Sequence, residues 1–214
     1  MLQEAGEPSE FVYFPTSGIV SLLTVLENGS MIEFATVGRE GTTGVPNYLH
    51  IPDGSMAVIS QLDGESLRMP VSDFDREVAS NGPFATIVGR YGGVLLALAA
   101  QSAACNRAHN VAERCARWLL MTHDQADRDE FAITQEFLAQ MLGVGRSSVT
   151  EVAGSLQEDG IVHYHRGRLT ILDRARLEEA SCECYGVISR HLRNLPGGTA
   201  LPDDIDGEAE LAAG

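Results

Sequence analysis

The chain has 214 residues, of which 44% are hydrophobic, so it is long enough and apolar enough to form a folded core. Its formal net charge of −15 argues against a uniformly basic nucleic-acid-binding protein, although a local basic patch can still meet phosphate. The longest uncharged apolar stretch, residues 92–104, falls short of the roughly 20 residues of a membrane-spanning helix. Because the first residues show no secretion signal, we expect a cytoplasmic protein without a membrane partner.

Short apolar stretches separated by glycine and proline fill the first part of the chain. We expect strands at residues 11–14, 19–26, 31–37, 56–62 and 66–69. The pair Asn28-Gly29 between two of these stretches is a strong hairpin signal. Short strands with such turns are typical of a small barrel or sandwich, and we assign residues 1–82 to this domain.

The pattern changes near Pro83, a residue that favours the first turn of a helix. Apolar and small residues then recur at spacings of three and four, which indicates one face of a long helix. The opposite face is rich in alanine and not strongly charged, so we expect burial on more than one side. One side would pair with a second copy of the chain, through Ile87, Tyr91, Val94, Leu95, Leu98, Ser102 and Cys105.

A second helix is predicted from Val111 to about Thr122, with Asn110 as its N-terminal cap. Together with the long helix it forms a predicted helical unit at residues 83–126. The polar residues 127–129 are expected to link this unit to the next domain.

Residues 131–172 show the spacing of a helix-turn-helix followed by a hairpin. Thr134 can cap a first helix, and Gly143 provides the tight reversal that ends it. A second helix begins near Ser147 and ends at Asp159-Gly160. Two strands, at residues 161–164 and 168–172, surround Arg166-Gly167 and form a predicted wing. The winged unit is assigned to residues 127–195, and residues 196–214 read as an acidic tail.

The segment 133–150, and its continuation 156–162, resembles the DNA-binding segment of Crp/Fnr transcription regulators. A less specific N-terminal match rests on Gly18, the Asn28-Gly29 hairpin and residues 41–44. The resemblance implies an α+β fold with a β-roll like that of cyclic-nucleotide-binding domains, a long dimerisation helix and a winged helix-turn-helix. The family has further structure before the segment that matches residues 4–8. A truncated β-roll is therefore one of the two expectations here, and a complete one is the other.

The same resemblance implies a homodimer on double-stranded DNA, in contact with RNA polymerase. The second helix would enter the major groove, where an arginine can bind guanine and a carboxylate can accept from cytosine. Phosphate contacts would come from the start of the first helix and from the wing. The expected DNA-binding residues are Thr134, Gln135, Arg146, Ser147, Ser148, Glu151, Arg166 and Arg168.

The residues that hold a cyclic nucleotide in this family are not matched here. A buried ribose hydroxyl needs an acceptor and a buried phosphate needs a cation. However, Gly44 is followed by Val45, Gly41 by Thr42, and no arginine lies near Ser55-Met56. We therefore expect no cofactor and an effector that is not a cyclic nucleotide.

Two alternatives remain open from the sequence. A metal- or thiol-responsive regulator could use Cys105 with His109, or Cys182 with Cys184 and His191, but common zinc-ligand spacings are absent and no metal is predicted. An enzyme built on a cupin-like barrel would need a cluster of histidines and carboxylates on the strands. His50 is the one histidine before residue 109, so no enzymatic activity is expected.

Overall fold

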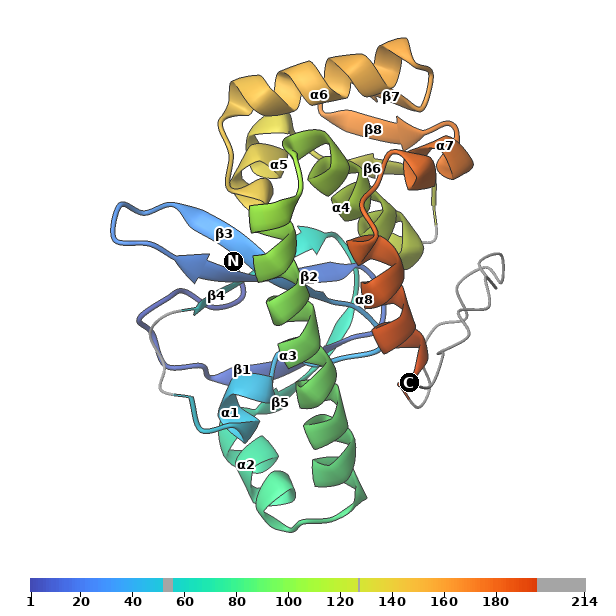
Figure 1. The fold of residues 1–214 in the computed structure, drawn as a ribbon. Helices are drawn as coiled ribbons and strands as arrows, with labels where there is room; N and C mark the ends of the chain where they lie inside the picture. The colour runs from blue at the N-terminus through green and yellow to red at the C-terminus, as the bar shows by residue number, and fades with distance from the viewer. Residues whose placement is uncertain (52–55, 127, 196–214) are drawn as a thin grey trace.

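The computed structural model describes residues 1–51, 56–126 and 128–195. It contains an N-terminal β-domain, a long helix beside it and a C-terminal winged helix-turn-helix (Figure 1). The five strands predicted for the β-domain are confirmed to within two residues at either end. They are β1 (Phe11–Pro15), β2 (Ile19–Val25), β3 (Met31–Val37), β4 (Met56–Leu62) and β5 (Ser66–Pro70).

These strands form two antiparallel sheets, one of order β3-β2-β4 and one that pairs β1 with β5. The central strand β2 is buried from Ile19 to Leu23, which explains its almost continuous apolar sequence. The chain enters β2 through Gly18, where φ is +72° and an added Cβ would lie 2.6 Å from the carbonyl oxygen of Leu62. Only glycine fits this position without strain.

Two short helices of the β-domain were not predicted from the sequence. Helix α1 (Val45–Tyr48) follows Gly44, and α2 (Val71–Ala79) connects β5 to the long helix. The buried ring of Phe74 in α2 lies 6.5 Å from Phe14 and 5.6 Å from Phe84, measured between ring centroids. This aromatic cluster fastens α2 to the β-domain.

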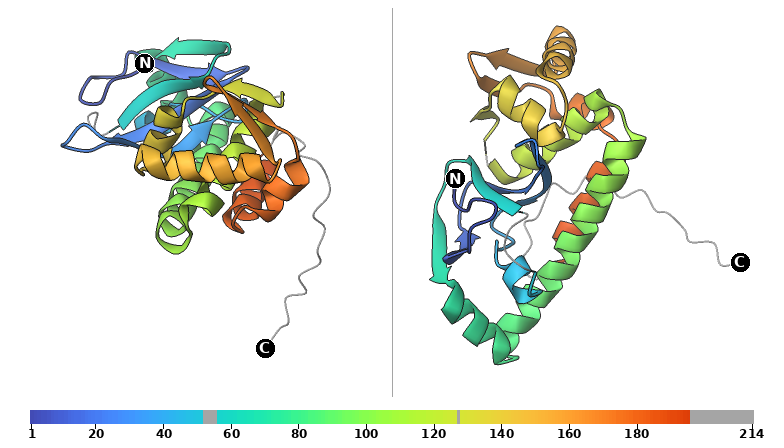
Figure 2. Two further views of the ribbon diagram at one scale, coloured as in Figure 1. Left: turned by 90° about the horizontal axis from the view of Figure 1, so that it is seen from above. Right: turned by 90° about the vertical axis from the view of Figure 1, so that its left-hand side faces the viewer.

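The long helix α3 (Pro83–Ala108) begins at the predicted proline and lies along one side of the β-domain (Figure 2). It contacts β3, α1, α2 and α8. Tyr91 comes so close to the backbone of Gly41 that an added Cβ there would lie 2.1 Å from the tyrosine ring. Among the described helices, α3 is long and apolar enough to cross a membrane by length and composition, a test that buried core helices also pass.

Helix α4 (Val111–Ala126) lies between the β-domain and the winged unit (Figure 1). Its start is a capping box: Asn110 Oδ1 accepts from the Glu113 amide at 3.0 Å, and Glu113 Oε2 accepts from the Asn110 amide at 2.9 Å. The predicted cap is therefore confirmed. Trp118, Leu119 and their neighbours on α4 belong to one core cluster that reaches from β2 to the winged unit.

A buried polar network joins α4 to the β-domain. The Glu33 carboxylate accepts from Trp118 Nε1 at 2.7 Å and from Ser21 Oγ at 2.6 Å. Gln61 continues the network, with its oxygen 3.0 Å from Ser21 Oγ and its Nε2 donating to Thr122 Oγ1 at 2.9 Å. Burial raises the pKa of Glu33 to about 7, although the two hydrogen bonds and nearby Arg117 oppose this shift.

The C-terminal part begins with β6 (Glu130–Ala132), which pairs with the wing in a sheet of order β6-β8-β7. After the wing come α7 (Arg174–Glu179) and α8 (Cys184–Arg193), which were not predicted. Helix α8 returns to pack against α3 and α4 (Figure 2). The predicted acidic tail and the first linker residue, Asp127, lie outside the described residues.

Candidate nucleic-acid interface

The first helix of the helix-turn-helix, α5, spans Gln135–Leu142. Thr134 caps it as predicted, because its hydroxyl oxygen accepts from the Phe137 amide at 3.1 Å. Gly143 ends the helix in the left-handed conformation, with φ +65° and ψ +38°. Residues Leu138, Ala139, Met141 and Leu142 are buried, so α5 is fixed to the core and only its start is exposed.

The second helix, α6, spans Arg146–Glu158, one residue earlier than predicted. It buries Val149, Ala153 and Leu156 against the core at helical spacing. The predicted base-contacting residues Arg146, Ser147 and Glu151 are all exposed, whereas Ser148 is partly buried. Ser147 and Glu151 are four residues apart and share one face, and Arg146 is the first residue of the helix. The fold therefore leaves all three predicted base-contacting side chains exposed in the first two turns of α6.

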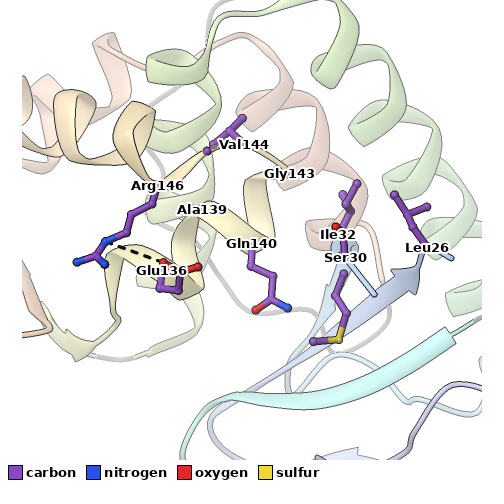
Figure 3. A pocket seen from close by; sticks show the side chains of 11 residues that line it. Leu26, Ser30, Ile32, Glu136, Ala139, Gln140, Gly143, Val144 and Arg146 are labelled. Atoms are coloured by element: carbon purple, nitrogen blue, oxygen red, sulfur yellow. Dashed lines mark ion pairs between the residues drawn. The ribbon is translucent and has the colours of Figure 1, made fainter. Parts of the chain in front are cut away.

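The guanidinium of Arg146 is not held rigidly. Its ion-pair partner is the carboxylate of Glu136 on α5, with Nε and Oε2 3.9 Å apart (Figure 3). Both side chains are about two-thirds or more exposed, at 67% and 75%, so this ion pair contributes little to stability. Arg146 is available to an external acceptor, but Glu136 is a local competitor for it.

Thr150 is a residue of this surface that was not predicted from the sequence. Its hydroxyl lies 2.8 Å from Gln135 Oε1 and 3.0 Å from the Arg146 carbonyl oxygen. Thr150 stands four residues after Arg146, so it shares the exposed face, and this spacing was the signal that could have identified it. The contact also positions Gln135, a predicted phosphate-contacting residue, against α6.

The wing consists of β7 (Val162–His165) and β8 (Arg168–Ile171). Its tip residues Arg166 and Gly167 both have positive φ, +48° and +78°, as a two-residue hairpin with a type I′ turn requires. Arg166 is exposed at this tip, whereas Arg168 Nε contacts Glu130 Oε1 at 2.7 Å. Both wing arginines were predicted to contact phosphate. Arg168 is paired with Glu130, whereas Arg166 lies at the tip of the wing, away from that carboxylate.

The winged unit is tied to α4 by buried and half-buried arginines. Arg114 on α4 donates to the carbonyl oxygen of Leu142 at the end of α5. Arg174 donates to Asp124 on α4 at 2.7 Å and to the Tyr185 hydroxyl at 2.6 Å. A cation near the last carbonyls of α5 also complements the helix dipole. These contacts position α5 and α6 relative to the rest of the chain.

A cleft of about 630 Å³ separates the β2–β3 hairpin from the helix-turn-helix (Figure 3). Leu26 and Ile32 line it from the hairpin, and Gln140 and Gly143 line it from α5 and the turn. The Ile32 side chain comes within 3.4 Å of the position that a Cβ on Gly143 would occupy. The β-domain thus contacts the turn that sets the angle between α5 and α6.

The predicted dimer face of α3 needs correction. Tyr91, Leu95, Leu98, Ser102 and Cys105 are buried within their own chain, at 8% exposure or less. They pack against the β-domain and α8, so they are not available to a second chain. The error has a physical reason: α3 is apolar or small on all sides, and periodicity alone does not tell which side faces its own chain.

The exposed face of α3 consists of other residues. Ile87, which was predicted, is 55% exposed, and Leu96, which was not, is 71% exposed. Gly93, Ala100, Ala103 and Ala104 are also exposed, and Val94 is partly buried. Because Ile87 and Leu96 are about two and a half helical turns apart, their side chains lie at opposite edges of this exposed side. Large exposed apolar side chains surrounded by small residues allow a second helix to approach closely.

In the β-domain, Gly44 and Val45, which were compared with the family's nucleotide motif, pack closely against the protein's own side chains. A Cβ on Gly44 would lie 2.7 Å from the rings and methyls of Phe74 and Val12. Val45 is buried as the first residue of α1. Ser55, part of the predicted phosphate position, lies outside the described residues.

Cys105, His109, Cys182 and Cys184, which the sequence suggested as two separate pairs, form a single group in the structure. His191, considered with the second pair, is exposed on α8 and does not belong to it.

These features define a winged helix-turn-helix protein with an N-terminal β-domain. A family model described as the Crp-like helix-turn-helix domain matches residues 113–180. No curated protein matches the chain by sequence. The chain therefore contains a Crp-like helix-turn-helix domain, which confirms the resemblance seen in its sequence.

Solved structures extend the likeness to the whole fold. FixK2 from Bradyrhizobium japonicum is 18% identical with a TM-score of 0.71, over 85% of this chain and 92% of that one. TTHB099, a CRP-family transcriptional regulator from Thermus thermophilus, is 20% identical with a TM-score of 0.68, over 84% and 92%. TTHA1359, a CRP/FNR-family regulator from the same organism, is 21% identical with a TM-score of 0.63, over 84% and 91%. The chain has the α+β fold of Crp/Fnr transcription regulators.

Proposed function

We propose that this protein is a transcription regulator that binds a specific double-stranded DNA sequence as a homodimer. The observation that supports this most directly is the start of α6 in a helix-turn-helix of Crp type, where Arg146, Ser147 and Glu151 are all exposed. A regulator of this kind acts in the cytoplasm, on DNA and RNA polymerase, and catalyses no reaction.

Within each half-site, Arg146 donates two hydrogen bonds to a guanine, and Glu151 accepts from a cytosine amino group. Thr134, Gln135 and Ser148 lie toward the start of the two helices and contact phosphate, as does Arg166 at the tip of the wing. Ser147 reaches a base or a phosphate. Net charge is strongly negative, so affinity depends on these local contacts more than on long-range attraction.

Two chains pair through the exposed, alanine-rich side of α3, an isologous contact with Leu96 at one edge and Ile87 at the other. Such a dimer presents two copies of α6 about 34 Å apart, one turn of DNA, and therefore requires an inverted repeat. The filled interior around Gly44 and Val45 supports an effector other than a cyclic nucleotide.

Selection of DNA from a random pool tests the proposal. Purified full-length protein is mixed with the pool at moderate salt, and the retained DNA is sequenced. We expect an enriched inverted repeat whose half-sites are centred one helical turn apart. Retention without any enriched sequence, or enrichment of a single unrepeated site, would contradict sequence-specific binding by a dimer.

A further inference from the structure

Four potential metal ligands meet where α3 ends and α8 begins. Cys105 is in the last turn of α3, and His109 directly follows that helix. Cys182 precedes α8 and Cys184 is its first residue. One ligand atom from each of the four lies within 4.8 Å of all the others, and the three cysteines are buried. The fold thus joins two sequence segments more than 70 residues apart.

Two of the six separations between the ligand atoms are close to those of a tetrahedral metal centre, and the others are within 4.8 Å. Zinc–sulfur bonds of about 2.3 Å and zinc–nitrogen bonds of about 2.0 Å place two sulfurs about 3.8 Å apart, and a sulfur and a nitrogen about 3.5 Å apart. In the structure, Cys105 Sγ and Cys182 Sγ are 3.5 Å apart, and Cys184 Sγ is 3.7 Å from His109 Nδ1. A metal ion therefore needs only small side-chain adjustments to reach all four atoms.

The orientation of His109 supports the same arrangement. Its Nδ1 faces the cysteines, while its Nε2 contacts the carboxylate of Glu183 at 2.9 Å. A carboxylate on the far ring nitrogen fixes the tautomer and the ring plane of a metal-binding histidine. Gln101 Nε2 lies 2.9 Å from Cys184 Sγ and supplies a hydrogen-bond donor to that sulfur.

Buried positive charge lies close to the group. Arg114 and Arg117 on α4 are 8% and 6% exposed, and the Nε atom of each has no hydrogen-bond partner among the described residues. Arg117 interacts electrostatically with Cys105, and Arg114 with Cys105 and Cys182. Three thiolates and one Zn²⁺ carry a net charge of −1, which these guanidinium groups would offset.

We propose that Cys105, His109, Cys182 and Cys184 bind one Zn²⁺ ion in each chain. On binding, each cysteine S–H bond breaks, the proton passes to water, and the sulfur lone pair is donated to the metal. Three thiolates and one imidazole favour zinc over magnesium or calcium, which prefer oxygen ligands. The ion cross-links the end of α3 to the start of α8, independently of DNA.

Metal analysis and cobalt binding test the site. Full-length protein purified with a reductant and without chelator should contain one zinc ion per chain. After removal of zinc, titration with Co²⁺ alone should give thiolate-to-cobalt charge transfer and the intense visible bands of tetrahedral cobalt, saturating at one equivalent. Removal of zinc should also lower the melting temperature.

Matched variants assign the ligands. Cys184→Ser should weaken metal binding and lower the thiolate-to-cobalt charge-transfer absorbance per bound ion, whereas Cys115→Ser, at a buried cysteine outside the group, should leave both unchanged. Glu183→Gln should leave the spectrum in place and weaken metal affinity about 10- to 100-fold. Because His109 is partly exposed, His109→Gln is expected to fold, to bind the metal more weakly and to shift the visible cobalt bands, since a water replaces the imidazole.

Two results would overturn the proposal. One is a reduced protein with all four thiols titratable that binds neither zinc nor cobalt stoichiometrically. The other is metal binding that survives Cys184→Ser and His109→Gln together. A purified protein with a Cys105–Cys182 disulfide would be reduced and titrated again, and failure to bind metal then would favour a thiol switch instead.

Discussion

At the scale of single residues, Glu33 shows how a buried carboxyl group makes stability depend on pH. Its pKa is about 7 in the folded chain and near 4.5 when the chain is unfolded, because burial penalises the charged form. The contribution of Glu33 to the free energy of unfolding is therefore highest below pH 4.5. It falls as the pH rises through the window from 4.5 to 7, where only the unfolded chain loses this proton, and then levels off.

We predict that Glu33→Gln removes this part of the pH dependence. The amide can donate to Ser21 and accept from Trp118 as the neutral acid does, without a buried charge. At pH 8 the variant should be more stable than the wild type by up to about 3 kcal/mol. Urea unfolding at pH 5 and pH 8 measures the difference, with Glu27→Gln on the exposed hairpin as control. Equal pH profiles for Glu33→Gln and the wild type would refute the assignment.

Arg146 allows a second prediction at this scale. Arg146→Ala should cost about 1–3 kcal/mol on DNA with the preferred base pair and much less on DNA altered at that position. Affinity is measured on a set of operators that are changed one base pair at a time, which distinguishes a base contact from a phosphate contact. Arg76→Ala, an exposed arginine on α2, is the control. A loss of affinity that is equal on all operators would make Arg146 a phosphate contact instead.

At the scale of elements, two glycines of the helix-turn-helix should respond in opposite ways to alanine. Gly143→Ala forces a side chain into the left-handed region and within 3.4 Å of Ile32, which should cost about 1–2 kcal/mol. Gly154 lies inside α6 with open space around it, so Gly154→Ala should stabilise the protein by about 1 kcal/mol. Chemical denaturation of both variants measures the signs. If both variants changed the free energy of unfolding in the same direction, backbone conformation would not be what determines the effect of alanine at these two positions.

The elements also show which information the sequence carried. Strands with Gly and Pro between them, the proline at the start of α3 and the helix-turn-helix spacing are local signals, and each was confirmed. Helix α2 has one buried residue, Phe74, so its pattern was too weak to be recognised. Helix α8 depends on packing against α3, which no local pattern encodes.

In the candidate site too, features set by local sequence could be predicted and features set by tertiary packing could not. The exposure of Arg146, Ser147 and Glu151 could be predicted because they lie outside the buried stripe of α6, and helical spacing is a local property. Their DNA contacts remain predictions. The cysteine group could not be assembled from the sequence, because Cys105 and Cys182 meet only after α8 has folded back.

At the scale of the whole molecule, the dimer is the main expectation. Leu96→Asp places a charge in the exposed face of α3 and should convert the dimer to a monomer with loss of operator binding. Leu67→Asp changes a leucine of similar exposure, 68% against 71%, on β5 and should leave the dimer intact. Sedimentation velocity at several concentrations measures the molar mass. A Leu96→Asp protein that remains dimeric would place the interface elsewhere.

The joint between α3 and α4 has a mechanical consequence. Only His109 and Asn110 separate the two helices, so a few backbone dihedral angles set the direction of α4. With 16 residues at 1.5 Å each, α4 is a lever about 24 Å long, and a rotation of roughly 10° at its base moves its far end by about 4 Å. In the proposed dimer, the two copies of α4 rotate in opposite directions. A small rotation at this joint therefore changes the distance between the two copies of α6, and with it their match to one turn of DNA.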